Sequence, residues 1–533
     1  MRELPHPLLS GGATSGPDGG TGASQGGPWL SSPPSLCPGD PRRTLTHFSQ
    51  ANVSHYDIFL LREDEEELYV GARDRVLALA VAPWGLGGSH GGYGVLSPPS
   101  SRCPPLQTEC FNFIRVLVPL NQSHLYVCGT YAFSPACTYI VRQPFLDGKG
   151  QCPFDPQHTY TALLVEGELY AGTMNNFQGN EPIISRSLGT RTLLKTDAFL
   201  PDAAFVASFS LPRDDKVYFF FEETAEEFDF FERLLVPRVA RVCKSDVGGD
   251  KVLQKKWTTF LKAQLLCSQP GRFPFNVIHH AFALPRPGGA DIYAVFTSQA
   301  GREGSAAVCA YSHEALEEVF EGKYKELNKE SSRWTVYGGP DMSPRPGSCS
   351  MGPSSDKALT FMKDHFLMDG KVAPAQGRPL LVRTNVTYTR IVVDETRAAS
   401  GTSYRVLFLA TADGFLHKAV ELPGAPHIVE SIQLFGTPEP VKNLLLAPGK
   451  VQRDGDGART IPKDGMGSIP LLSLRRASSM WVTPLESSKC RWPTAACTGA
   501  APSACWRGTP TAAGAARRGP ASPPAAPRTR EQG

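Results

Sequence analysis

Short apolar runs separated by turn-forming residues recur along the chain from about residue 46 to about residue 450. The runs are rich in Tyr, Phe, Val and Leu, and each predicts a strand, a turn at Gly or Asn and a second strand. The clearest examples are ELYVGARDRVLAL, HLYVCGTYAF, ELYAGTMNNF, KVYFFFEET, DIYAVFTSQ and YRVLFLATADGFLHKAV. This pattern predicts an all-β domain over residues 46–450.

The spacing of these runs suggests a repeated unit. The recurring aromatic positions are Tyr69, Tyr126, Tyr170, Tyr218, Tyr293 and Phe408. Successive gaps are 57, 44, 48, 75 and 115 residues, and the gaps of 44 and 48 are close to the length of one four-stranded propeller blade. The last gap fits two units or one unit with a large insertion. A blade cannot bury both faces alone, so several must pack around an axis. A sandwich or two stacked β domains would also fit such irregular spacing.

The spacing of apolar residues in one stretch does not decide between helix and strand. KVLQKKWTTFLKAQLLC, residues 251–267, has apolar positions that fit one face of a helix. Its Trp, two Thr and Phe favour a strand, so we predict a strand. The Gly-rich stretch GLGGSHGGYG, residues 85–94, matches no dinucleotide or phosphate-loop spacing, and we predict a flexible loop there.

Composition limits the classes of function. The 533 residues include 54 basic and 51 acidic side chains, a formal net charge of +3, which argues against nucleic acid as the main partner. No apolar run approaches the length needed to span a bilayer. Residues 1–45 are rich in Gly, Ser and Pro, lack the apolar segment of a secretory signal and are predicted to be disordered.

Cysteines and glycosylation motifs favour an oxidising route. Nine of the 13 cysteines lie between residues 103 and 349. The sequence contains no CxxC pair of the kind that binds a metal ion. Sequons occur at Asn52, Asn121 and Asn385. Buried reduced thiols of a cytosolic protein are the alternative, but cysteines and sequons together favour disulfides and secretion.

Several longer motifs resemble one family. CGTYAFSPACTYI, GKGQCPFDP, GELYAGTMNNFQGNEPIISRSLG and GPSSDKALTFMKDHFLMD together resemble the sema domain of a class 4 semaphorin, with a match over roughly residues 46–450. The resemblance implies a seven-bladed β-propeller that is extracellular or attached to the plasma membrane. It also implies homodimers that bind plexin-type receptors, with no enzymatic activity and no cofactor. Axon guidance, cell repulsion or migration, or immune regulation would be the outcome.

The resemblance also implies roles for particular residues. It pairs Cys103 with Cys110, Cys128 with Cys137, Cys243 with Cys349 and Cys267 with Cys309, and it leaves Cys152 as a buried free thiol. Receptor contacts in the family come from loops on one propeller face, including the region that matches FMKDHFLMD. Lys363 and His365 are therefore candidate contacts. An ordinary solvated loop with Phe361, Phe366 and Leu367 packed below is the alternative.

Two other classes of function fit parts of the sequence less well. An acidic cluster contains Glu222, Glu223, Glu226, Glu227, Asp229 and Glu232. This cluster could supply the paired carboxylates of a propeller glycosidase, but a charged loop beside an aromatic strand is favoured. His279 and His280 are neighbours on a strand and point to opposite faces, so they form a poor metal pair. An intracellular propeller scaffold is the remaining alternative, favoured by the missing signal sequence.

The end of the chain departs from the family pattern. After VKNLLLAP the resemblance implies the rest of the last blade, a cysteine-rich module, an immunoglobulin-like domain and a membrane span. From about Val451 the chain instead becomes polar and then rich in Ala, Pro and Arg. Codons compatible with residues 493–514, read in a shifted frame, can encode a string similar to the family's cysteine-rich module.

These observations suggest that the frame is broken near Lys450. We therefore expect residues 451–533 to form a disordered, frame-shifted or intron-derived tail, with a genuine disordered tail as the alternative. Such a tail would leave the last blade incomplete and its edges exposed. The polypeptide as written is predicted to fold poorly and to lack a membrane anchor.

Overall fold

A computed structural model gives the three-dimensional structure. The chain divides into two units, Met1–Ser488 and Lys489–Gly533, and all described residues lie in the first. The structure describes residues 35–36, 46–62, 67–82, 85–94, 108–140, 145–188, 191–197, 199–228, 233–299, 304–350, 355–397, 401–424, 426–435, 437–447, 469–474 and 480–482.

Six sheets each contain four antiparallel strands in the same order from one edge to the other, and we number them as blades. Blade 1 comprises β3 (Ile58–Arg62), β4 (Glu67–Ala72), β5 (Arg75–Ala82) and β6 (Gly85–Gly94); blade 2 comprises β7 (Ile114–Pro119), β8 (Leu125–Gly129), β9 (Ala136–Ile140) and β10 (Leu146–Asp147); blade 3 comprises β11 (Thr161–Val165), β12 (Glu168–Met174), β13 (Pro182–Leu188) and β14 (Arg191–Lys195). Blade 4 comprises β15 (Ala204–Phe209), β16 (Lys216–Thr224), β17 (Leu235–Cys243) and β18 (Leu261–Leu265); blade 5 comprises β19 (Val277–Arg286), β20 (Gly289–Thr297), β21 (Ser305–Ser312) and β25 (Leu381–Thr384); blade 6 comprises β26 (Tyr388–Arg397), β27 (Ser403–Thr411), β28 (Phe415–Val420) and β29 (His427–Gln433).

Residues 313–380, inserted between β21 and β25, form most of the structure outside the blades. This segment, called the insertion below, contains α1 (His313–Phe320), the hairpin of β22 (Lys325–Asn328) and β23 (Arg333–Val336), α2 (Asp356–Asp364) and β24 (Leu367–Val372). β24 pairs in parallel with β18 and so extends blade 4. β1 (Ser35–Leu36) pairs in the same way with β29, and a short 3-10 helix covers Thr108–Cys110.

The repeated aromatic positions mark the blades, as predicted. Each lies in the second strand of a different blade, from Tyr69 in β4 to Phe408 in β27. The gap of 115 residues between the last two contains one insertion rather than a further blade. The all-β propeller prediction is therefore confirmed, and the period of the aromatic residues located the blades correctly.

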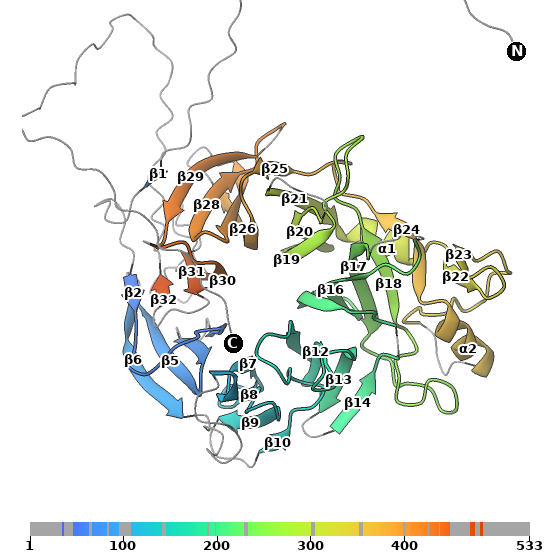
Figure 1. Ribbon diagram of the computed structural model, residues 1–533, viewed down its shortest axis with the longest axis horizontal. Helices are drawn as coiled ribbons and strands as arrows, with labels where there is room; N and C mark the ends of the chain where they lie inside the picture. The colour runs from blue at the N-terminus through green and yellow to red at the C-terminus, as the bar shows by residue number, and fades with distance from the viewer. Residues whose placement is uncertain are drawn as a thin grey trace, which may run out of the picture. The chain divides into compact units, whose positions relative to one another are not determined.

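The blades follow one another around a ring (Figure 1). First strands contact their neighbours in chain order: β3 with β7, β7 with β11, β11 with β15, β15 with β19 and β19 with β26. The ring shows six such blades, where the resemblance implies seven. The strands left over form another four-stranded sheet, in the order β2 (Thr46–Phe48), β32 (Met480–Val482), β31 (Ile469–Leu474) and β30 (Val441–Ala447).

Hydrophobic side chains fill the spaces between neighbouring blades. One cluster joins Tyr69 and Val76 of blade 1 to Ile114 and Leu125 of blade 2. Others join blade 3 to blade 4, blade 4 to blade 5 and blade 5 to blade 6. The core therefore lies between sheets, because each blade buries its faces only against its neighbours.

Three expectations about local structure need correction. Residues 85–94 form β6 rather than a flexible loop, because their backbone groups pair with β5 through an irregular register despite the glycines. In residues 251–267 only Leu261–Leu265 is a strand, and residues 251–260 form turns and isolated bridges that bury Trp257. The tail supplies β31 and β32, which pair with β30 and β2, so β30 is not left unpaired.

Candidate functional site

Five aromatic side chains gather around the loops of blades 2 and 3. We call them the aromatic patch: Phe111, Tyr131, Phe133, Phe145 and Phe177. Phe111, Phe145 and Phe177 are 37%, 43% and 59% exposed, and the other two are half-buried. Large apolar side chains gathered on a surface often indicate an interaction site, whereas single exposed ones do not.

Ring contacts join four members of the patch in two pairs. The rings of Tyr131 and Phe145 stack with centroids 5.6 Å apart, and Phe177 meets Phe133 edge-on at 5.4 Å. The Arg73 guanidinium lies 4.3 Å from the centroid of the Phe111 ring, which adds a cation at the margin of the patch.

The loop that carries Tyr131 and Phe133 is held in an unusual conformation. Tyr131, Ala132 and Phe133 have φ values of 42°, 54° and 59°, in the left-handed region that non-glycine residues rarely occupy. The disulfide Cys128–Cys137, with 4.0 Å between the two Cα atoms, closes the base of the loop. Strained backbone of this kind persists only where its surroundings hold it, and it is commonest at functional sites.

Hydrogen bonds to the segment that precedes β7 complete this support. The Tyr131 amide donates to the side-chain oxygen of Asn112 at 3.1 Å, and the Thr130 amide donates to the Phe113 carbonyl at 3.1 Å. A Cβ at Gly129 would lie 2.0 Å from Asn112 Oδ1, so only glycine allows this close approach. The aromatic rings of the loop are therefore held in place before any partner binds.

The loop that carries Phe177 is ordered by its own polar side chains. The Asn175 side-chain amide donates to the Glu181 carboxylate at 2.7 Å, and the Asn175 main-chain amide donates to the Glu181 carbonyl at 2.8 Å. The Asn180 amide donates to the Asn176 side chain at 3.3 Å. These bonds close the loop across its base, so Phe177 projects from a rigid turn.

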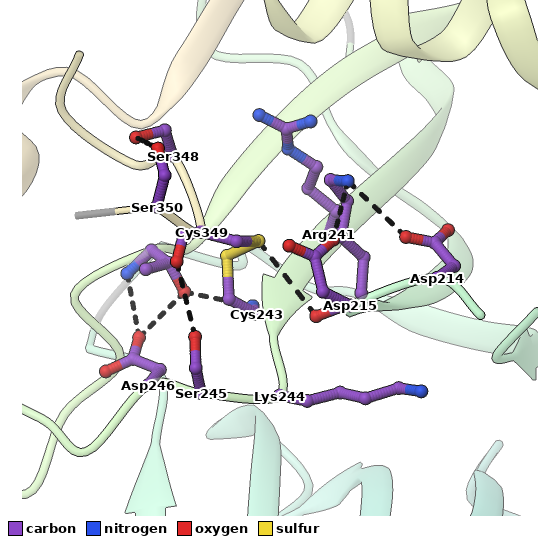
Figure 2. Close-up of a disulfide and its surroundings, with 12 residues drawn as sticks. Asp214, Asp215, Arg241, Cys243, Lys244, Ser245, Asp246, Ser348, Cys349 and Ser350 are labelled. Carbon is purple, nitrogen blue, oxygen red and sulfur yellow. Dashed lines mark hydrogen bonds and ion pairs between the residues drawn. A yellow bond between two sulfur atoms is a disulfide. The ribbon is translucent and has the colours of Figure 1, made fainter. Parts of the chain in front are cut away.

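The second exposed structure beside the ring is the insertion, which is attached to blade 4. Figure 2 shows Cys349 of the insertion bonded to Cys243 at the end of β17, with 5.4 Å between their Cα atoms. Arg241 of β17, also in Figure 2, donates to Glu317 of α1 at 2.9 Å and to Glu321 at 3.2 Å. The Tyr218 hydroxyl lies 2.9 Å from Glu317 as well. A covalent bond and a charged network thus fix the insertion to the ring.

The comparisons with known proteins agree with this architecture. The Sema domain family matches residues 278–448. Human Semaphorin-4A is 56% identical over 440 residues, which cover 77% of this chain and 56% of that protein. The extracellular domains 1–2 of Drosophila Semaphorin 1a superpose with a TM-score of 0.69 at 32% identity, covering 82% of this chain and 86% of that one. The chain belongs to the semaphorin family.

A further structural match concerns a complex. The solved structure of Drosophila Plexin A in complex with Semaphorin 1b matches this semaphorin chain with a TM-score of 0.68 at 26% identity, covering 82% of this chain and 86% of the matched chain. The chain spans about half the length of the curated relatives it matches. The class 4 resemblance found in the motifs is confirmed by the identity to Semaphorin-4A.

Three of the four disulfides implied by the resemblance are present in the semaphorin chain. These are Cys128–Cys137, Cys243–Cys349 and Cys267–Cys309. Cys110 is disulfide-bonded, and Cys103 lies outside the described residues. Cys152 is a buried free thiol whose pKa is raised by burial.

The two candidate contact residues on the insertion differ in their surroundings. Lys363 is exposed on α2. His365 follows the helix, and its ring stacks on Phe361 at 3.9 Å while Nδ1 lies 2.8 Å from the Phe361 carbonyl. Below them Phe366 stacks on Phe199 at 4.2 Å and Leu367 is buried. Lys363 is thus available to a partner, whereas His365 is engaged in packing and ending the helix.

The three sequons are accessible in the described part of the chain. Asn52, Asn121 and Asn385 are all exposed, and Asn52 and Asn385 have positive φ values in turns. Their side chains therefore lie where a glycan could extend into solvent. Attachment of glycans at these positions stays a prediction.

The acidic cluster forms structural ion pairs. Glu223 lies 2.7 Å from both Arg238 and Lys262, and all three side chains are buried. Burial raises the pKa of Glu222 to about 7, whereas Arg238 outweighs burial at Glu227 and lowers its pKa. This contrast was not expected from the sequence. Glu226 is exposed, and Asp229 and Glu232 lie outside the described residues.

The paired histidines are half-buried. Burial lowers the pKa of His279 to about 4 and that of His280 to about 3, so both are neutral at physiological pH. Among the described residues there is no group of three or more side chains placed to hold a metal ion. None of the helices within these residues is long and apolar enough to cross a membrane.

The aromatic patch was not found from the sequence. Its loops contain the motifs TYAFSPAC and TMNNFQGN, which sequence reasoning used only to recognise the family. The available signal was a large aromatic residue inside a turn rich in Asn and Gly, where a strand core has no use for it. Assembling the five side chains requires contacts between blades 2 and 3 that no local pattern shows.

Proposed function

We propose that this chain is an extracellular semaphorin-type ligand that binds plexin-type receptors through the ring face carrying the aromatic patch. The observation that carries the proposal is the patch itself, an exposed aromatic cluster on loops held by a disulfide and by hydrogen bonds. The family and the match to the Plexin A–Semaphorin 1b complex support the class of partner. Axon guidance, cell repulsion or migration, or immune regulation would follow from receptor binding.

The structure of the patch suits tight binding. Aromatic side chains dominate the energetic centres of protein interfaces, and burying one Phe side chain contributes about 1.5–3 kcal/mol. Phe177 has most to gain, because 59% of its surface is exposed before binding. The rigid loops lower the entropy lost on association. The proposed activity is binding, and it requires neither a cofactor nor a catalytic group.

Substitution of Phe177 tests the proposal. Binding of the full chain to immobilised plexin ectodomains is measured by surface plasmon resonance for the wild type, Phe177→Ala and Phe273→Ala. Phe273 is 50% exposed but lies between blades 4 and 5, so it provides a matched control. We expect Phe177→Ala to raise Kd about 30-fold, equivalent to about 2 kcal/mol, and Phe273→Ala to change it less than twofold. Equal effects of the two variants would contradict a binding site at the patch.

The insertion provides a second candidate surface, supported by the exposure of Lys363. Lys363→Ala in the same assay separates the two locations. If Lys363→Ala weakens plexin binding while Phe177→Ala does not, the receptor contacts the insertion rather than the patch. A small effect of Lys363→Ala on the association rate alone would indicate long-range attraction.

Secretion and glycosylation form part of the same proposal. The exposed sequons and the disulfides support an extracellular location. Expression in secreting animal cells should give a mass decrease on glycosidase treatment, reduced stepwise by Asn→Gln changes at residues 52, 121 and 385. Light scattering on the purified product tests the homodimer that we infer from the family; a monomer at micromolar concentration would oppose it.

We also propose that the sheet β2–β32–β31–β30 takes the place of a seventh blade. β30 contacts both β26 and β3, and its side chains face both neighbours. Val441 and Leu444 join the cluster of blade 6, and Leu445 packs against that of blade 1. Pairing of β2 with β32 would close the ring with strands from distant parts of the chain. The sema domain would then extend to about residue 482 instead of 450.

A further inference from the structure

A cleft of about 240 Å³ lies where blades 5 and 6 meet. Its walls come from β19 and β20, the end of β21, the segment after β24, β27, and Glu421, which follows β28. The floor is apolar, with Tyr311 and Leu380, and charged side chains line the sides. Sites for drug-sized ligands usually measure 300–1,000 Å³, so this cleft suits a single side chain or a small ion.

Three guanidinium groups and two carboxylates line the cleft. Asp291 pairs with Arg286 and, at 3.2 Å, with Arg405. Arg405 lies 3.5 Å from Glu421, which also accepts a hydrogen bond from the Tyr293 hydroxyl at 3.3 Å. Both carboxylates therefore already have cationic or hydroxyl partners inside the cleft.

Arg378 is the cation left over. It is exposed at the edge of the cleft and donates to the Gly424 carbonyl at 3.2 Å. Within the described residues it forms no ion pair. The cleft thus carries one positive charge in excess, together with a planar donor group suited to bidentate hydrogen bonding with a carboxylate.

We infer that the cleft binds one carboxylate group, presented by an acidic side chain or a chain end of a protein partner. Arg378 supplies the ion pair, because Asp291 and Glu421 already balance the charges of Arg286 and Arg405. A sulfated polysaccharide fits less well, because the cleft has one positive charge in excess and such a chain carries many negative charges. The apolar floor accommodates the carbon atoms of the bound side chain.

This site is separate from the proposed receptor surface. Asp291 and Arg405 lie near the starts of the second strands of blades 5 and 6, whereas Tyr131 and Phe177 follow the ends of the second strands of blades 2 and 3. Because all blades share one strand order, the two ends belong to opposite faces of the ring. The cleft therefore adds a second contact that leaves the aromatic patch open.

The inference is tested with N-acetylglutamate as the probe and N-acetylglutamine as its neutral match. Binding of both to the full chain is measured by saturation-transfer NMR, with wild type, Arg378→Gln and Arg272→Gln. Arg272 is an exposed arginine between blades 4 and 5, remote from the cleft, and serves as the control. We expect the wild type and Arg272→Gln to bind N-acetylglutamate equally, and Arg378→Gln to bind it about tenfold more weakly or worse.

Several outcomes would overturn the assignment. Equal binding of N-acetylglutamine would show that the carboxylate is not recognised, and unchanged binding by Arg378→Gln would show that the probe binds elsewhere. If inorganic sulfate displaces the probe and itself binds ten times more tightly, the occupant is a sulfate group and the peptide assignment is wrong. Phe177→Ala should leave probe binding unchanged, so failure here is distinguishable from failure of the proposed receptor site.

Discussion

Replacing Asp57 should weaken the junction between blade 1 and the sheet of β30. The Asp57 side chain is 3% exposed; it pairs with Arg115 of β7 and, at 2.8 Å, with Lys442 of β30. Its carbonyl also accepts a hydrogen bond from Asn443 at 3.0 Å. Residues nearly 400 positions apart are therefore joined by one carboxylate, and Asp57→Asn keeps its shape while removing its charge.

The expected magnitude follows from burial. Arg115 is only 5% exposed, and it would lose its only carboxylate partner among the described residues. Removing one member of a buried pair costs about 3–5 kcal/mol because the other charge stays buried. We expect about 3 kcal/mol for Asp57→Asn, at the low end because Asn can still accept a hydrogen bond. Lys442 is 26% exposed, so Lys442→Gln should cost only about 1 kcal/mol.

Urea unfolding and hydrogen exchange measure the effect. Asp197→Asn provides the control, because the pair of Asp197 and Lys256 has a similar 2.9 Å distance but side-chain exposures of 35% and 25%. Its cost should stay below about 1 kcal/mol. In Asp57→Asn, amide exchange in residues 441–447 should accelerate about 100-fold, as 3 kcal/mol of local destabilisation requires.

The dependence on pH provides an independent check. Burial opposes ionisation of Asp57, but Arg115 and Lys442 outweigh it, so its pKa lies below the ordinary value in the folded state. The stability contributed by the carboxylate is therefore present above the unfolded pKa and is lost as pH falls through the folded pKa. The difference between wild type and Asp57→Asn should be constant from pH 5 to 8 and shrink in acid. A cost equal to that of Asp197→Asn at pH 7 would refute the reasoning.

Three other predictions follow from the described contacts. Changing both Cys128 and Cys137 to Ser should destabilise the chain by about 2–3 kcal/mol, measured by urea unfolding. The same change should weaken plexin binding, because it releases the loop that carries Tyr131 and Phe133. Unchanged binding would disprove that the disulfide preorganises this loop. His365→Ala should lower stability by about 1 kcal/mol through loss of the ring stack on Phe361, whereas Lys363→Ala should change stability by less than about 0.5 kcal/mol because Lys363 is exposed. A larger loss of stability for Lys363→Ala than for His365→Ala would oppose the structural role of the histidine. Burial raises the pKa of Glu222 to about 7, so its ionisation lowers the stability of the folded chain as pH rises from the pKa of the unfolded state toward 7. Glu222→Gln should therefore raise the melting temperature at pH 8 but not at pH 4.5. No gain at pH 8 would contradict the burial argument.

Much of the fold was predictable because blades repeat in the sequence. Tyr126, Tyr170 and Tyr218 lie in runs whose composition favours strands, and the gaps of 44 and 48 residues between them match one blade each. The strand β6 was missed because glycines carry no propensity signal for a strand. Its backbone is recruited by β5, and such pairing depends on a neighbour rather than on its own residues.

The candidate sites were less accessible to sequence reasoning. Lys363 was identified through the family motif, but nothing local indicated that His365 would stack on Phe361. Residues of the charged cleft, such as Arg378 and Arg405, come from segments separated in sequence. Their excess charge emerges only when each carboxylate is assigned its partners in space.

The sequence by itself determined the strands, their repeated order and the family, because apolar alternation, turn residues and long motifs are local properties of the chain. Tertiary structure decided which surfaces are available for binding. Phe177 and Phe133 meet, and Asp57 joins Arg115 to Lys442, only after the blades are arranged in a ring. The physical reason is that exposure and charge compensation depend on packing between sheets, and residues from different blades gain their neighbours only when the ring assembles.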